Sequence, residues 1–371
     1  MNLASVKLIS LLFALVLLSG CAGIAVRGTV GGQTIESRVD AQIAHYYLAD
    51  YLAGRRSDAA LNARIDRVYA NARDDLPDRH ELKRLSDEFS VDFAALYFAD
   101  RIARTPVYRR FRTDFDRIYK NIRATFAEGL AELPAQADHY AVVFVPGYLY
   151  KRHRMTGADL AAPRAALQRI GLTHHFVETV EDGAIEPNAE IVAAAIQQQA
   201  RAGRRLIVAS VSKSGAEVGL ALSRLAPTEA DHVAAWVNIV GTLQGSPLAD
   251  EGLLQLEELT GRVNIAGVES LSTERSRQRF NDFHIPEHVL VVNYIGIPLT
   301  GSISMWGRSG YVQLRPYGPN DGLSLLSDLI VPGGVTLAEL GRDHFLLDGQ
   351  IDVTTVALAL TLIEQLEQRG Q

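Results

Sequence analysis

Apolar residues recur at two different periods along the chain, and the change of period divides it into two sections. Between residues 37 and 133 they recur at every third or fourth position, which is typical of helices that bury one face. From residue 139 onward, short apolar runs alternate with helical patterns. The sequence therefore predicts a helical section followed by an α/β section.

The helical section, taken as residues 37–135, contains four predicted helices, near residues 43–51, 61–69, 78–98 and 107–126. We interpret their apolar stripes as core, in an extra domain or in a layer packed on the α/β section. The fourth helix also carries the basic residues Arg109, Arg110, Arg112, Arg117, Lys120 and Arg123. This run is typical of a solvated helix face, and the alternative is a surface for phospholipid head groups or an acidic partner.

The α/β section, taken as residues 136–371, alternates predicted strands with predicted helices. The strands are expected at 139–147, 175–180, 204–209, 233–241, 288–297 and, as the last one, 328–331. Helices are expected at 158–171, 188–203, 216–225 and 351–366, with a largely helical insertion near 247–285. Continuous apolar strands with short connections predict a mostly parallel central sheet with helices on both faces.

Composition and charge exclude some functions. The 371 residues are 47% hydrophobic, which is enough for a substantial core, and carry a formal net charge of −6. An acidic balance argues against a general nucleic-acid binder. The sequence contains no Cys/His spacing for zinc and no phosphate-binding loop. We therefore expect neither a metal nor an organic cofactor, and the oligomeric state stays open.

The first 20 residues have the pattern of an export signal. Lys7 precedes an apolar run at residues 8–18, which is shorter than the ~20 residues of a membrane span. The run ends in Leu-Ser-Gly-Cys, and Cys21 is the only cysteine of the chain. A lone cysteine directly after an export signal does not fit a disulfide framework.

This segment resembles the lipobox of bacterial lipoproteins. The resemblance implies that Cys21 becomes the first residue after cleavage and carries a lipid, such as palmitate, that anchors the protein to the cell envelope. Ala22 after the cysteine implies the outer membrane. The alternative is an ordinary secretory signal in which Cys21 is incidental. Residues 21–36, which contain four glycines, are expected to be a tether, with a short strand within it as the alternative.

A strand, a tight turn and a helix follow one another at residues 204–222, in the stretch RRLIVASVSKSGAEVGLAL. The turn has small residues two before and two after Ser212, which leave room for strand and helix to meet. The stretch resembles the nucleophile elbow of α/β-hydrolases, with serines in place of the two glycines. The resemblance implies that Ser212 is the nucleophile and that the backbone N–H of Lys213 binds the oxyanion. In the alternative register Ser214 is the nucleophile.

The earlier stretch HYAVVFVPG is similar to the strand that precedes the first helix in the same family. It ends in Pro146-Gly147, where the family commonly has His-Gly. By this resemblance Tyr148 supplies the second backbone N–H of the oxyanion hole.

The family resemblance also implies the acid and the base, because the chain order is Ser, then Asp or Glu, then His. The stretch Asn-Asp-Gly-Leu resembles the acid-bearing segment of bacterial lipases and nominates Asp321. Of the ten histidines, His344 alone lies beyond it. Asp328 is a second choice of acid, and Asp343 a poor one, because adjacent residues rarely point to the same place.

Together these features imply a membrane-tethered serine hydrolase, lipase- or esterase-like, that cleaves a hydrophobic carboxylic ester. A thioesterase or amidase would use the same residues. A catalytically inactive lipoprotein that keeps the fold as a binding scaffold is the alternative from another functional class. The insertion near 247–285 falls where the family often has a lid and is expected to shape the substrate pocket.

Overall fold

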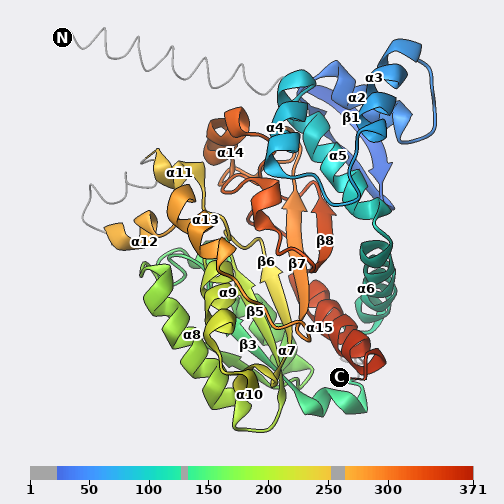
Figure 1. Ribbon diagram of the computed structural model, residues 1–371. Coiled ribbons are helices and arrows are strands. Elements are labelled where there is room, and N and C mark those ends of the chain that lie inside the picture. The colour runs from blue at the N-terminus through green and yellow to red at the C-terminus, as the bar shows by residue number, and fades with distance from the viewer. Residues whose placement is uncertain (1–22, 127–132, 252–263, 371) are drawn as a thin grey trace, which may run out of the picture.

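The computed structural model describes residues 23–126, 133–251 and 264–370 (Figure 1). The expected signal peptide and Cys21 lie outside the described residues, as does the middle of the 247–285 insertion. No helix within the described ranges is long and apolar enough to cross a membrane.

A six-stranded parallel sheet forms the centre of the molecule, with strand order β4-β3-β5-β6-β7-β8. Its strands are β3 Tyr140–Val145, β4 His174–Phe176, β5 Arg205–Val211, β6 Val233–Ile239, β7 Leu290–Ile297 and β8 Val335–Leu340. Every residue of β3 and of β7 is buried, as expected for strands covered on both faces. The predicted mostly parallel sheet is confirmed.

Helices cover both faces of this sheet (Figure 1). On one face, α7 Ala161–Arg169, α15 Ile351–Gln368 and α6 Pro106–Thr125 pack on strand residues such as Val142 and Phe144. On the other, α8 Ile185–Ala200 and α9 Ser214–Arg224 pack on the alternate residues Ala141, Val143 and Val145. The period-2 alternation of side chains along each strand thus divides the core into two layers.

The expected tether at residues 21–36 is wrong for its described part, which folds as a hairpin of two strands, where the alternative was one short strand. β1 Ile24–Val30 pairs with β2 Gln33–Val39 in antiparallel register. The turn between them is Gly31-Gly32, in which both residues have the positive φ that favours glycine. Val26, Val30, Ile35 and Val39 are buried in a third core cluster. The alternate apolar residues form a strand pair here because the N-terminal helices cover them, which the glycine content of the segment does not reveal.

The helices that follow the hairpin are α2 Gln42–Tyr46, continued by the π-turn η1 Tyr47–Tyr51, then α3 Ala59–Ala70, α4 Arg79–Glu88 and α5 Val91–Arg104. The predicted helix at 78–98 is therefore two helices. Ser90 separates them, because its hydroxyl accepts a hydrogen bond from Phe93 N (3.1 Å) and caps α5.

These N-terminal elements pack on the sheet rather than forming a separate unit. The third core cluster combines Val26, Leu48 and Phe93 with Ile297 of β7 and Ala338 of β8. α6 belongs to the sheet's own layer, beside α15. The expected boundary at residue 135 therefore does not separate two packed units, and the section is a layer on the α/β core.

The last strand does not lie at residues 328–331, where it was predicted, but at Val335–Leu340. Residues 326–329 form the short 3-10 helix η8 Leu326–Leu329, and β8 begins at Val335 after a turn at Gly333-Gly334. Leu326 and Leu329 pack against the N-terminal layer, so their apolar character reflects tertiary burial rather than a strand.

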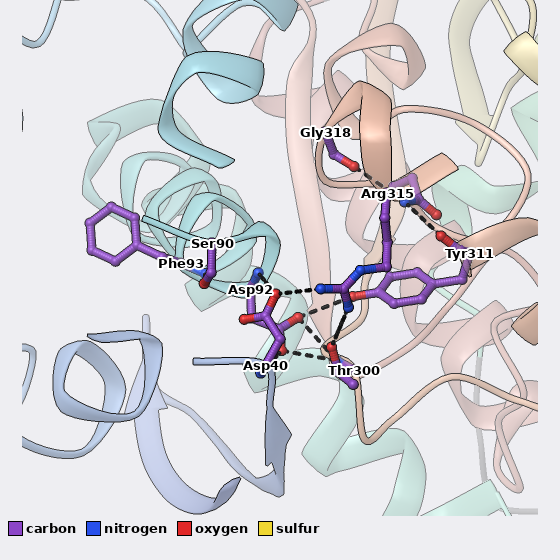
Figure 2. Close-up of polar contacts among 9 residues, drawn as sticks. Asp40, Ser90, Asp92, Phe93, Thr300, Tyr311, Arg315 and Gly318 are labelled. Atoms are coloured by element: carbon purple, nitrogen blue, oxygen red, sulfur yellow. Dashed lines mark hydrogen bonds and ion pairs between the residues drawn. The ribbon is translucent and has the colours of Figure 1, made fainter. Parts of the chain in front are cut away.

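Two buried carboxylates join the N-terminal layer to the α/β core (Figure 2). Asp92, at the start of α5, accepts hydrogen bonds from Asp40 N (2.7 Å), Thr300 N (3.0 Å) and Tyr311 Oη (3.0 Å). Arg315 Nη2 pairs with Asp40 Oδ2 at 3.0 Å. Burial, then the neighbouring Asp40 carboxylate, raises the pKa of Asp92 to about 6.

This raised pKa predicts a pH-dependent stability. An unfolded Asp titrates near ~3.9, so Asp92 stabilises the fold fully below that pH and the contribution is lost as the pH rises through about 6. Between about pH 4 and pH 7 the free energy of unfolding should fall by roughly 1–3 kcal/mol more in the wild type than in Asp92→Asn. Urea denaturation at each pH measures this difference.

The control for this experiment is Asp87→Asn, because Asp87 is exposed and pairs with Lys83 on α4. Its pH profile should match that of the wild type. Asp328, whose pKa burial also raises to about 6, stays present in all three proteins and cancels in the comparison. Equal slopes for the wild type and Asp92→Asn would contradict the prediction.

Candidate active site

The turn between β5 and α9 holds Ser212 in a left-handed backbone conformation, with φ of 58°. A non-glycine residue there costs on the order of 1–3 kcal/mol, so the surroundings must hold the turn. Ser212 N donates to Ile239 O (2.9 Å), and Ser212 O accepts from Gly215 N (2.9 Å) and Thr242 N (3.0 Å). The next strand and the first turn of α9 thus fix the serine from both sides.

The two serines that flank this turn are buried, and the hydroxyl of each one is hydrogen-bonded. Ser210 Oγ accepts from Trp236 Nε1 at 2.9 Å. Ser214 Oγ accepts from Val211 N (2.8 Å) and lies 2.9 Å from Val145 O, to which it can donate. These bonds explain how serines replace glycines here, since each hydroxyl has a partner. They also make Ser214 a structural residue of the turn, unlike Ser212.

Close packing behind the turn requires glycine. A Cβ on Gly215 would lie 2.6 Å from Asn238 Oδ1 and 2.7 Å from the Cα of Gly241. Real Cβ atoms do not approach other atoms so closely, so α9 can start against the end of β6 only with glycine at this position.

Ser212, His344 and Asp321 form a hydrogen-bonded chain although they are far apart in sequence. Ser212 Oγ lies 2.9 Å from His344 Nε2, and His344 Nδ1 lies 2.7 Å from Asp321 Oδ2. His344 N also donates to Asp321 O at 2.8 Å, which couples the two loops through their backbones. Asp321 is fully buried and His344 is 6% exposed.

Asp321 is oriented by its own turn. Its Oδ1 accepts from Leu323 N (2.9 Å) and Ser324 N (2.7 Å), which leaves Oδ2 directed at the histidine. The other nominated acids are engaged elsewhere: Asp343 accepts from Ser304 N (2.8 Å), and Asp328 pairs with Arg79 (3.6 Å). Asp321 is the carboxylate that contacts His344.

Two buried asparagines hold the chain at residues 329–331, which follows the acid-bearing segment, and the sequence analysis missed both. Asn238 of β6 donates to Leu329 O (2.9 Å) and to Asn293 Oδ1 (3.2 Å) of β7. Asn293 Oδ1 also accepts from Val331 N at 2.9 Å. The sequence did contain a signal for this role, which is one asparagine in each of two otherwise mostly apolar strands. A buried polar side chain requires a hydrogen-bonding partner, so each asparagine indicated a contact.

A cavity of about 530 Å³ opens beside Ser212 and His344. Its lining is mainly apolar, and at the Ser212 end it includes Tyr148, Leu323 and Phe345. Among the described residues, no group of three or more His, Cys, Asp or Glu is arranged to hold a metal ion.

Comparison with known proteins identifies the architecture. No protein-family model and no curated protein sequence matches the chain. A solved structure of the metagenomic carboxyl esterase MGS0156 is similar, with a TM-score of 0.53 and 21% identity, covering 64% of this chain and 78% of that one. The mature lipase BlEst2 of Bacillus licheniformis has a TM-score of 0.47 and 23% identity, covering 56% and 85%.

The protein has the α/β-hydrolase fold. The predicted fold class is thereby confirmed, and the hydrogen-bonded chain lies at the carboxyl edge of the parallel strands, where open α/β sheets bind ligands. Tyr148 and Ser212 both line the cavity, and Lys213, which follows Ser212, is the N-cap residue of α9.

The expectation that the 247–285 insertion shapes the pocket is wrong for its described part. Its helices are α11 Pro247–Asp250, α12 Ile265–Glu269 and α13 Thr273–Asn281. The described residues that line the cavity come from other segments, including the loop at 148–158 and residues 344–348. α13 instead packs on α9, and Arg279 pairs with Glu186 of α8 at 2.6 Å.

The side chain of Lys213 has a structural role that the sequence reading did not foresee. It is 3% exposed and forms an ion pair with Glu217 one turn along α9. Asn188 Nδ2 donates to the same Glu217 oxygen at 2.8 Å, and Asn188 also bonds Val180 N and O. This buried network ties the residue after Ser212 to α8.

Removing one partner of this pair should be strongly destabilising. Glu217→Gln leaves the Lys213 ammonium buried without its counter-charge, which typically costs about 3–5 kcal/mol. The double variant Lys213→Met/Glu217→Leu should recover most of that loss, because no charge remains to be buried. Urea denaturation measures all three proteins.

A matched control is Glu88→Gln, which breaks the exposed pair with Arg84 at the same spacing on α4. That change should alter the free energy of unfolding by less than about 0.5 kcal/mol. Similar losses for Glu88→Gln and Glu217→Gln would contradict the role given to burial.

Proposed function

We propose that this protein is a serine hydrolase that cleaves a carboxylic ester through an acyl-enzyme. The observation that carries the proposal is the chain from Ser212 Oγ to His344 Nε2 (2.9 Å) and from His344 Nδ1 to Asp321 Oδ2 (2.7 Å), at the wall of an apolar cavity. A serine hydroxyl is a weak nucleophile at neutral pH, and a base held in the correct tautomer activates it.

In the first half-reaction Ser212 Oγ attacks the acyl carbonyl while His344 Nε2 takes the hydroxyl proton. Asp321 keeps the other proton on Nδ1 and stabilises the imidazolium that forms. The backbone N–H groups of Tyr148 and Lys213 stabilise the oxyanion of the tetrahedral intermediate. Amides in the first turn of a helix lack intrahelical acceptors, which suits Lys213 to this role.

The intermediate collapses when the carbon–oxygen bond to the alcohol breaks and His344 returns its proton to the leaving oxygen. Water then attacks the acyl-Ser212 ester, with His344 again taking the proton. The acid product leaves and Ser212 regains its hydroxyl. The net reaction is ester plus water to acid plus alcohol.

The apolar cavity favours a hydrophobic, lipid-like acyl group. Transfer of such a group from water contributes binding energy in proportion to its buried area. A solved carboxyl esterase has the same fold, which is consistent with ester hydrolysis. Thioesters and amides present the same carbonyl, so they belong in the substrate screen.

Labelling with a fluorophosphonate probe tests the nucleophile. We expect the wild type to label and Ser212→Ala to lose the label, because removing a triad residue lowers reactivity by on the order of 10⁴–10⁶. Ser309→Ala is the control, since Ser309 is exposed on α14 Arg308–Leu314 and should leave labelling unchanged. A folded wild type that does not label would refute the enzyme and favour a non-catalytic binding scaffold.

We also propose that Cys21 carries the lipid that tethers the protein to the bacterial envelope, at the outer membrane. The support is the lipobox-like sequence before this single cysteine. Several acyl chains give firm membrane binding, at about 0.8 kcal/mol per buried CH₂. In cells expressing the full chain, Cys21→Ser should move the protein from the membrane pellet to the soluble fraction after export. Unchanged partitioning would refute the anchor.

A further inference from the structure

The cavity beside Ser212 does not stay at the surface but continues into the core between the sheet and α15. Strand residues on one face of the sheet line it: Val142, Phe144, Ile207, Ala209, Val237 and Tyr294. These residues also belong to the core cluster under α7 and α15, and each is at most 7% exposed. Protein cores contain few voids larger than a water molecule, so a space of about 530 Å³ here is of ligand-pocket size.

One face of α15 forms the long wall of this space. The lining residues are Ile351, Thr354, Thr355, Leu358, Ala359 and Leu362, at the three- and four-residue spacing of a single helix face. From Ile351 to Leu362 the helix rises by about 16 Å. The hydrocarbon core of a bilayer is about 30 Å thick for two leaflets, so this wall is roughly one lipid tail long.

The depth of the cavity runs away from the reactive serine. α15 begins shortly after His344, at the edge where the parallel strands end. Among its lining residues, Leu362 lies farthest along α15 from that edge. The paired strand residues Val142 and Ile207 lie three and four residues before the ends of β3 and β5. A carbonyl carbon at Ser212 Oγ would therefore direct its acyl chain down the length of α15.

The polar atoms in this wall are already paired. Thr354 Oγ1 donates to Asp348 Oδ2 (2.6 Å), and Thr355 Oγ1 donates to Ile351 O (2.6 Å). Asp348 Oδ1 accepts from Gln350 N at 2.9 Å. The wall thus needs no polar group from a ligand, which favours a plain hydrocarbon chain over a sugar, peptide or polar acid.

We propose that this space is a tunnel that binds one long, extended fatty acyl chain of the substrate, and that Ala359 and Leu362 set the chain length that fits. The inference rests on the proposed ester hydrolysis at Ser212. It narrows the substrate to esters of long-chain fatty acids, with the alcohol part at the mouth, where Met155 and Leu347 are exposed.

The experiment compares p-nitrophenyl esters of butanoic and hexadecanoic acid. We expect the wild type to prefer the long ester in kcat/KM. Ala359→Phe places a ring about three-quarters of the way along the α15 wall. It should lower kcat/KM for the hexadecanoyl ester by ~100-fold, since each methylene that loses its burial costs about fourfold. Hydrolysis of the butanoyl ester should stay within about twofold, because the short chain ends before residue 359.

Gln368→Phe is the matched control, because Gln368 lies exposed near the end of the same helix and should change neither ester. Leu362→Ala is the opposite variant: it lengthens the tunnel and should shift the preference toward still longer chains. If Ala359→Phe fails to fold, as judged by thermal unfolding, Leu362→Ala alone tests whether the α15 wall sets the chain length.

The outcomes separate the two proposals. If the folded wild type neither labels with fluorophosphonate nor cleaves either ester, the proposed function is wrong. If it labels and cleaves the butanoyl ester but shows no preference for the long chain, the tunnel is wrong and the enzyme stands. Folded Ala359→Phe and Leu362→Ala variants with an unchanged long-to-short ratio would overturn the tunnel in the same way.

Discussion

The left-handed backbone at Ser212 is the constraint on which the rest of the site depends. A serine held at positive φ projects from the end of β5, but only if the strand before it and the helix after it can come together. Gly215 permits that approach, and the hydroxyls of Ser210 and Ser214 are hydrogen-bonded to neighbouring groups. The strain is local, and the hydrogen bonds that hold it come from β6 and α9.

The proposed base, His344, and the proposed acid, Asp321, are held from a different direction. His344 follows β8. Asp321 lies in a turn, and the chain after that turn is bonded to the sheet by Asn238 and Asn293, at residues 329–331. The N-terminal layer reaches the same region, since Asp92 accepts a hydrogen bond from Tyr311 (Figure 2). The backbone carbonyl of Tyr311 in turn accepts from Asn320, the residue before Asp321. The layer therefore supports the loop that carries Asp321, which gives a structural reason for its place in the fold.

Polar and apolar side chains line different parts of one cavity. The buried chain of Asp321 and His344 lies at its carboxyl-edge end, where a low dielectric strengthens hydrogen bonds to developing charge. Beyond it the wall becomes hydrocarbon along α15. This division matches the proposed substrate, which has a reactive carbonyl at one end of a long apolar chain. Under that proposal, the core binds the chain and the rim carries the chemistry.

The sequence by itself determined the features that depend on neighbouring residues or on chain order: the strand, turn and helix around Ser212, the alternation that builds a parallel sheet, and the nomination of Asp321 and His344. Tertiary structure alone decided the hairpin at 24–39 and the strand at 335–340, because their apolar residues are interpretable only with the surface that covers them. The cavity wall on α15 has the same origin. Its residues look like ordinary core in sequence, and only the space left opposite them makes them the wall of a cavity.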